Sequence, residues 1–88
     1  MKLRITINIA GPTTLDALSP GAAAVIDAVS VVDGTVLRLQ EMGLTTGAHV
    51  VVTRRAPLGD PLEISVRDTR VCMRREHARA FSVRPVTP

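Results

Sequence analysis

The stretch LQEMGLTTGAHV, which spans Leu39–Val50, decides how the fold of this chain is interpreted. It places Gly43 and Gly47 between a segment with helical spacing and the valines at 50–52. A loop that binds phosphate needs a strand, then glycines, then a helix whose N-terminal amides face the anion. Because the order here is helix, glycines and strand, we interpret both glycines as residues that turn the chain. The stretch therefore predicts a corner of a small domain and no nucleotide site.

The first half of this corner is predicted to be a two-turn helix over Thr35–Met42. Val36, Leu39 and Met42 recur at helical spacing, so we expect them on one face of the helix. The polar residues between them are available to solvent. The pattern is typical of a short amphipathic helix packed on a core.

The second half of the corner is predicted from its glycines. Gly43 is expected to end the helix in a left-handed conformation, as the C′ residue of a Schellman motif. In that motif Leu39 and Leu44 make a hydrophobic contact across the helix end. Gly47 is expected at a positive φ in the following turn, which leads into a strand over His49–Arg55.

Alternation of apolar and polar residues predicts further short strands on both sides of the corner. These strands span Leu3–Ile9, Leu62–Val66, Arg70–Arg74 and Phe81–Val86. The apolar run Ala22–Val32 is also interpreted as a strand, with a helix as the alternative because of its alanines. Pro85 is expected to confine the last strand to a sheet edge, since proline cannot donate to a ladder. A single helical turn is expected at Glu76–Ala80. Closely spaced turns without alternating strands and helices indicate a mainly β fold, a small barrel of about five to six short strands with one or two short helices.

Composition points to one small domain without a membrane segment. The chain has 88 residues and one aromatic residue, Phe81, so its core must be small and aliphatic. The longest apolar stretch, Ala22–Val32, is interrupted by Asp27 and is far shorter than the roughly 20 residues of a membrane span. The N-terminus lacks the unbroken apolar segment of a signal peptide. We therefore expect a cytoplasmic protein that does not insert into the membrane.

Residues with catalytic or metal-binding chemistry are few and scattered. The single cysteine, Cys72, excludes an intramolecular disulfide and a cysteine-rich metal site. Alternation places it on the outer face of its strand, between inward-facing Val71 and Met73. His49 and His77 do not lie at a spacing typical of a metal site. We predict no catalytic residue, no metal ligand and no cofactor, and do not expect an enzyme.

The positive charge is concentrated in the second half of the chain. Residues 1–50 carry a net charge of −1, whereas residues 51–88 carry eight arginines against four carboxylates, a net charge of +4. Such a surface suits an acidic protein or a nucleic acid, and the alternative interpretation is a solvated face without a partner. Nucleic acid is the less expected partner, because exposed aromatic side chains for base stacking are missing. A small basic barrel that binds RNA or the ribosome is one alternative interpretation.

Several short motifs occur in a fixed order along the chain. They are RLQEMGL at 38–44, Gly47, APLGDP at 56–61, and VCMR at 71–74 followed by Glu76 and Ala78. In this order they resemble the FeoA family, ferrous iron transport protein A. The resemblance covers about residues 15–86 and departs from the family pattern at Gln40, where an apolar residue is usual.

The resemblance divides the chain into two parts. Residues 15–88 form the FeoA-like domain. Residues 1–14 form an N-terminal extension, which is an added strand, a flexible tail or an element for homo-oligomerisation.

The resemblance implies a cytoplasmic, non-enzymatic SH3-like domain that takes part in ferrous iron transport. Family members are thought to assist the membrane ferrous iron transporter FeoB by contacting its cytoplasmic GTP-binding region. The same fold occurs as the C-terminal domain of iron-dependent repressors, so a detached repressor-type interaction domain is a further alternative. No tight stoichiometric metal site is implied, and weak binding of transition metal ions is left open.

Two surfaces are predicted to bind a partner. The first consists of a strand end and the loop after it, Arg54, Arg55, Pro57, Leu58, Gly59, Asp60 and Pro61. Its prolines limit loop entropy and Leu58 offers an exposed apolar anchor. Asp60 has a structural alternative, which is to cap the amides of its own loop.

The second predicted surface is the corner Met42, Gly43 and Leu44. Its alternative interpretation is a helix end packed on the barrel.

Overall fold

The computed structural model describes residues 12–86. The strand expected over Leu3–Ile9 lies outside these residues, as does most of the N-terminal extension. The elements are β1 (Thr13–Thr14), the 3-10 turn η1 (Leu15–Ala17), β2 (Ala23–Val29), α1 (Gly34–Glu41), β3 (His49–Arg55), β4 (Leu62–Val66), β5 (Thr69–Met73), α2 (Arg75–Ala78) and β6 (Phe81–Val86). The expectation of a mainly β fold with short strands and two short helices is confirmed.

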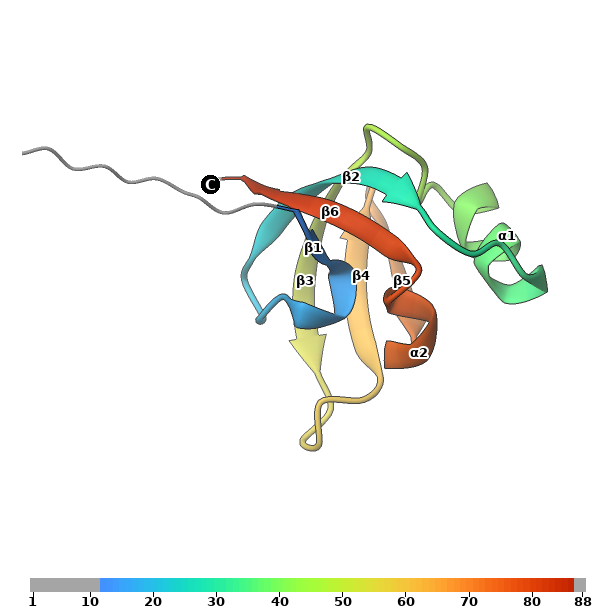
Figure 1. The fold of residues 1–88 in the computed structure, drawn as a ribbon. Coiled ribbons are helices and arrows are strands. Elements are labelled where there is room, and N and C mark those ends of the chain that lie inside the picture. Colours follow the sequence, from blue (N-terminus) through green and yellow to red (C-terminus); the bar gives the residue numbers. More distant parts are fainter. Residues whose placement is uncertain (1–11, 87–88) are drawn as a thin grey trace, which may run out of the picture.

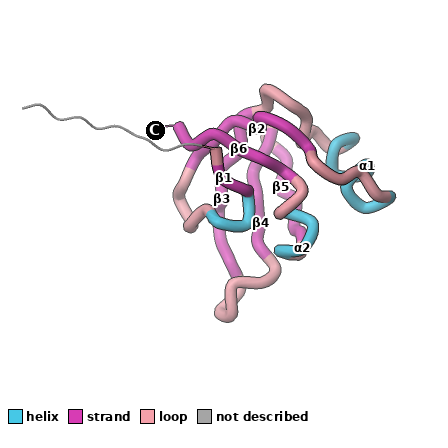
Figure 2. The backbone as a smooth tube through the Cα atoms, in the orientation of Figure 1, coloured by secondary structure: helices cyan, strands magenta, loops and turns pink. Residues whose placement is uncertain are grey.

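The strands form a single antiparallel sheet in the order β1-β6-β2-β3-β4-β5. Figure 1 shows this sheet curving around a common core, and η1 contacts α2. Arg79, which follows α2, lies with its Nε 3.3 Å from Oδ2 of Asp16 in η1. Figure 2 shows α1 as a separate short helix to one side of the strands. The result is a small barrel with α1 attached to the connection between β2 and β3.

The core is built from the alternating positions that the sequence indicates. Leu62, Ile64 and Val66 of β4 are buried, and the residues between them are half-buried. Phe81 is fully buried at the start of β6. Branched aliphatic residues from every long strand fill the remainder, as expected for a chain with one aromatic side chain.

The end of α1 confirms the predicted Schellman motif. The Leu44 amide donates to the Leu39 carbonyl at 3.1 Å, and the Gly43 amide donates to the Gln40 carbonyl at 3.0 Å. Gly43 has φ +123°, and Leu39 and Leu44 are both buried. These are the two hydrogen bonds and the hydrophobic pair that define the motif.

Met42 differs from the expectation of one face shared with Val36 and Leu39. It is the C-cap of α1 and is 43% exposed, whereas Val36 and Leu39 are buried. The backbone of Met42 is still helical and its amide donates to the Arg38 carbonyl. Its position in the sequence places it about 120° around the helix axis from Val36, at the rim of the buried face.

The turn after α1 also agrees with the sequence. The Ala48 amide donates to the Thr45 carbonyl at 2.9 Å, and Gly47 has φ +90° at the third position of this turn. β3 then begins at His49 and ends at Arg55, as predicted.

β2 is shorter than the predicted strand over Ala22–Val32. It ends at Val29, which pairs with Phe81, the first residue of β6. Beyond Val29 no strand among residues 12–86 pairs with the chain, and Val31 and Val32 leave the sheet and are exposed.

The prediction that β6 lies at a sheet edge is wrong. β6 pairs with β2 on one side and with β1 on the other, where Thr13 and Thr14 pair with Val83 and Ser82. Pro85 is compatible with this position because β1 is two residues long and does not reach it. Within residues 12–86, Pro85 pairs with β2 alone.

No helix in the described part of the chain is long and apolar enough to cross a bilayer.

Candidate functional site

The loop between β3 and β4, residues 56–61, has a defined backbone conformation. At its base the Ala56 amide donates to the Pro61 carbonyl at 3.0 Å, and at its tip the Gly59 amide donates to the Ala56 carbonyl at 2.7 Å. Gly59 has φ +87°, a conformation that favours glycine. The loop is therefore held by its own backbone as well as by its prolines.

Arg55 connects this loop to the turn η1. Its Nη1 donates to the Gly59 carbonyl at 3.1 Å, and its Nη2 donates to the Asp16 carbonyl. The Nε atom is buried and has no partner among the described residues. Arg55, predicted to face a partner, thus directs its guanidinium into the protein and positions the loop.

Asp60 connects the other side of the loop to α2. Its Oδ1 accepts a hydrogen bond of 3.1 Å from the amide of Arg75, the first residue of α2. That amide is one of the donors a helix N-terminus leaves without an intrahelical partner. Asp60 therefore has a structural contact, but the amide that it caps belongs to α2 and not to its own loop, as the structural alternative expected.

Leu58 occupies the exposed tip of the loop. Its side chain is 91% exposed, the highest value among the exposed large apolar residues of the described chain. Pro57 beside it is also exposed. A loop tied to η1 and α2 thus presents one large apolar side chain to solvent, which is the form of an anchor residue.

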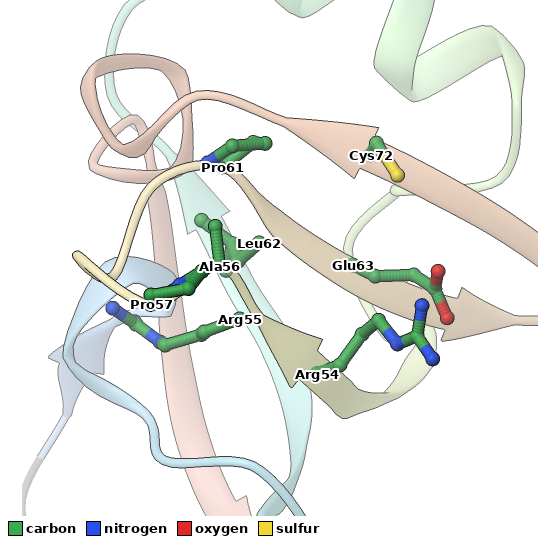
Figure 3. Close-up of a pocket in the computed structure, with 8 residues that line it drawn as sticks. All are labelled: Arg54, Arg55, Ala56, Pro57, Pro61, Leu62, Glu63 and Cys72. Atoms are coloured by element: carbon green, nitrogen blue, oxygen red, sulfur yellow. The ribbon is translucent and has the colours of Figure 1, made fainter.

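A groove of about 360 Å³ lies beside the loop, on the outer face of the sheet (Figure 3). It is lined by Arg54, Arg55, Ala56, Pro57, Pro61, Leu62, Glu63 and Cys72. Glu63 and Cys72 were not among the predicted site residues. The signal for them is the strand register, since Arg54 pairs with Glu63 and Glu63 pairs with Cys72 across three strands.

The charge around the groove is mainly positive. The Glu63 carboxylate accepts a hydrogen bond from the Thr53 hydroxyl at 2.7 Å and lies 4.0 Å from Nε of Arg70. Arg54 and Arg74 are exposed, and neither has an ion pair within residues 12–86. We call Arg54 together with residues 56–61 the loop surface.

The second predicted surface, Met42, Gly43 and Leu44, is largely packed. Gly43 and Leu44 are buried, and a Cβ on Gly43 would lie 3.5 Å from a side-chain carbon of Val66. Among the three, Met42 alone is exposed.

The two predicted surfaces lie at opposite ends of β4. Val66, which Gly43 approaches, is the last residue of this strand, and the loop surface precedes its first residue, Leu62. Four residues along a strand span about 13 Å. The structure therefore does not bring the two surfaces together.

Within the described residues, no group of three or more histidine, cysteine, aspartate or glutamate side chains is arranged to hold a metal ion. Nε2 of His77 lies 3.6 Å from a carboxylate oxygen of Glu76, its neighbour in α2. His49 is exposed at the start of β3.

Comparison with known proteins identifies the family. A family model of the FeoA domain matches residues 13–85. The FeoA protein from Chlorobium tepidum is 33% identical with a TM-score of 0.79, covering 85% of this chain and 71% of that chain. Iron(II) transport protein A from Clostridium thermocellum is 28% identical with a TM-score of 0.79, covering 84% of this chain and 46% of that chain. No curated protein matches the chain in sequence.

A third solved structure describes the fold. FeoA from Stenotrophomonas maltophilia, solved in complex with zinc and described as a procaryotic SH3 domain protein, is 29% identical with a TM-score of 0.72. The match covers 82% of this chain and 89% of that chain. The predicted SH3-like fold is thereby confirmed. Because the family model spans most of the chain and the sheet matches solved FeoA structures, this chain belongs to the FeoA family, non-enzymatic accessory proteins of ferrous iron transport.

Proposed function

We propose that this protein is a cytoplasmic regulatory accessory of ferrous iron uptake that binds the cytoplasmic GTP-binding region of a FeoB transporter through the loop surface. The observation that carries the proposal is Leu58, which is 91% exposed at the tip of a loop fixed on both sides. An anchor on a rigid loop loses little conformational entropy when it enters a partner's pocket.

The names of related proteins support the same role. The Stenotrophomonas maltophilia protein is described as possibly acting as a bacterial ferrous iron transport activating factor. Another solved relative, 25% identical with a TM-score of 0.76, is described as an iron uptake regulatory protein. Both descriptions fit a protein that acts by contact and not by catalysis.

Arg54 is the second residue of the loop surface that we assign to the partner. It is exposed and lacks an ion pair within residues 12–86, in contrast to Arg55, which is engaged internally. A free cation beside an apolar anchor favours a partner with an apolar pocket and an acidic rim.

A pull-down with the purified cytoplasmic region of the transporter tests the proposal. The variants are Leu58→Asp and Arg54→Glu, and the matched control is Leu37→Asp, the same substitution at a 49% exposed leucine of α1. We expect Leu58→Asp to lower the affinity by about 30-fold, the effect of losing an interface anchor worth about 2 kcal/mol. Full capture by a folded Leu58→Asp variant would sink the proposal.

A further inference from the structure

We propose that the free edge of β5 binds an acidic, extended segment of a partner protein as an added strand. This inference rests on the proposed function, because the groove beside the loop surface is part of the same binding site. It adds the chemistry of the partner segment that binds there. The segment that we propose has one small apolar residue, with an acidic residue two positions before it and another two positions after it.

β5 is the last strand of the sheet and pairs with β4 alone within the described residues. The hairpin turn at Arg67 and Asp68 has two residues at positive φ, +50° and +64°, as in a two-residue type I′ turn. Such a turn makes its flanking residues, Val66 and Thr69, a hydrogen-bonded pair. The register of the whole hairpin follows from that pair.

Alternation from Thr69 determines which backbone groups of β5 are free. Thr69, Val71 and Met73 direct their amides and carbonyls toward β4. Arg70 and Cys72 therefore direct theirs away from the sheet. Among residues 12–86 no other strand pairs with this side of β5. An unpaired row of this kind is a template for strand addition.

The side chains along this edge define the charge of the strand that fits it. Arg70 and Cys72 are exposed on the outer face of β5. Arg74, which directly follows β5 in an extended conformation as the N-cap of α2, is exposed as well. The Arg70 side chain is 76% exposed, and its nearest carboxylate, that of Glu63, lies 4.0 Å away. A strand beside β5 would therefore carry acidic side chains opposite Arg70 and Arg74.

The groove defines the central position of the same strand. Cys72 lies between the two arginines and lines the groove together with Glu63 and Arg54. Figure 3 shows Cys72, Glu63 and Arg54 following one another across β5, β4 and β3. A residue opposite Cys72 would lie beside this thiol at the edge of the groove, and a small apolar side chain suits this position because a free cysteine packs as a small apolar group. The pattern reads the same in both directions, so it suits a parallel or an antiparallel strand.

RNA is less well matched to this edge than a peptide. The arginines would attract phosphates, and phosphate oxygens accept from free amides, but a phosphate has no donor for the carbonyls that alternate with these amides. Base stacking needs exposed aromatic side chains, and Phe81, the one aromatic residue of the chain, is buried. Binding of RNA is therefore treated as a competing outcome of the test.

The test is a titration of the isotope-labelled full chain with a synthetic peptide containing Glu-Thr-Val-Thr-Glu. Amide signals of Arg70 and Cys72 are expected to shift and to become protected from hydrogen exchange. Two further peptides carry N-methyl groups, one at the glutamates and valine and the other at the threonines. Because alternate amides face β5, we expect one of these two peptides to lose binding and the other to keep it.

Protein variants test the charge. Arg70→Glu is expected to weaken peptide binding by about tenfold, because an attraction becomes a repulsion. Arg38→Glu, a charge reversal at an exposed arginine of α1, is the matched control and should change binding by less than about twofold. Dispersed amide spectra establish that both variants are folded.

Three outcomes overturn the inference. The first is no binding of the acidic peptide at millimolar concentration. The second is a binding affinity that falls equally for both N-methylated peptides, or that changes for neither of them. The third is binding of single-stranded RNA that displaces the peptide with a steep salt dependence.

Failure of the inference is distinguishable from failure of the proposed function. Leu58→Asp leaves the β5 edge intact, so the peptide result does not depend on capture of the transporter. If capture of the transporter region requires Leu58 but the acidic peptide does not bind, the added strand is contradicted and the loop surface is not. If the peptide binds but Leu58→Asp does not change capture of the transporter region, the loop surface is contradicted and the added strand is not.

Discussion

At the scale of single residues, neighbouring arginines at the end of β3 have opposite surroundings. Arg54 is exposed on the outer face, whereas Arg55 donates to the carbonyls of Gly59 and Asp16. The β3–β4 register shifts between Val52 and Arg54, so simple alternation does not run through this part of the strand. The sequence predicted that both arginines face a partner. In the structure Arg54 is exposed to solvent, whereas Arg55 holds the loop in place.

Removal of the Arg55 guanidinium is expected to destabilise the protein. Arg55→Leu deletes the donors to two carbonyls, which should lower the free energy of unfolding by about 1–3 kcal/mol. Arg54→Leu, the matched control, should change it by less than about 0.5 kcal/mol. Urea unfolding followed by circular dichroism measures both, and equal values for the two variants would contradict the assigned roles.

Glycine-to-alanine substitutions distinguish two causes of lost stability, which are strain at a positive φ and collision of the added Cβ with its neighbours. Gly43 and Gly21 have φ of +123° and +91°, and nothing lies within 4 Å of a Cβ built on Gly21. Gly43→Ala and Gly21→Ala should each cost about 1–3 kcal/mol of stability, because alanine is strained in this region. Gly34→Ala, at a helical position with open space, should be neutral or stabilising by up to about 1 kcal/mol. Thermal unfolding of the three variants measures the difference, and a loss of stability in Gly34→Ala equal to the others would refute the argument.

At the scale of elements, local patterns predicted most of the strands and the helix end. The alternation in Leu62–Val66 and the spacing of Leu39, Gly43 and Leu44 contain the information for β4 and for the Schellman motif. These features depend on contacts within a few residues of the chain. Sequence reasoning is therefore sufficient for them.

The features that local patterns missed depend on distant contacts. β1 has two residues, too few for any periodicity, and it exists because β6 offers a partner. The position of β6 inside the sheet depends on β1, so Pro85 suggested the wrong place. The bond from Asp60 to the amide of Arg75 joins residues that no short-range rule connects. For the same reason the sequence located the loop surface but not the groove beside it.

The outer position of Cys72 on β5 is checked by thiol labelling. Cys72 is exposed, while Val71 and Met73 on either side are buried. We expect the native protein to react completely with a maleimide in the absence of denaturant, since access does not require unfolding. Labelling that proceeds only in urea would show that β5 is rotated relative to this description.

At the scale of the whole molecule, the fold has a short helix on one side and a rigid loop on the other. The loop surface, the groove and the β5 edge lie on the outer face of β3, β4 and β5, where arginines outnumber carboxylates. In the proposed complex this positive charge should affect how fast the partner associates.

Salt is expected to weaken the proposed complex with the transporter. The association rate should fall as ionic strength rises, because exposed arginines are screened. Arg54→Glu should show a shallower dependence than the unchanged chain. Stopped-flow or surface-plasmon kinetics over a salt series measure both, and a rate independent of salt would contradict a contribution of charge to association.

The loop surface is proposed to contact the cytoplasmic GTP-binding region of the transporter. A titration of the nitrogen-15-labelled chain with that purified region, followed by amide spectra, measures this contact residue by residue. We expect shifts or broadening at residues 54–63 and unchanged signals in α1. Signals unchanged throughout the chain, or changes confined to α1, would contradict it.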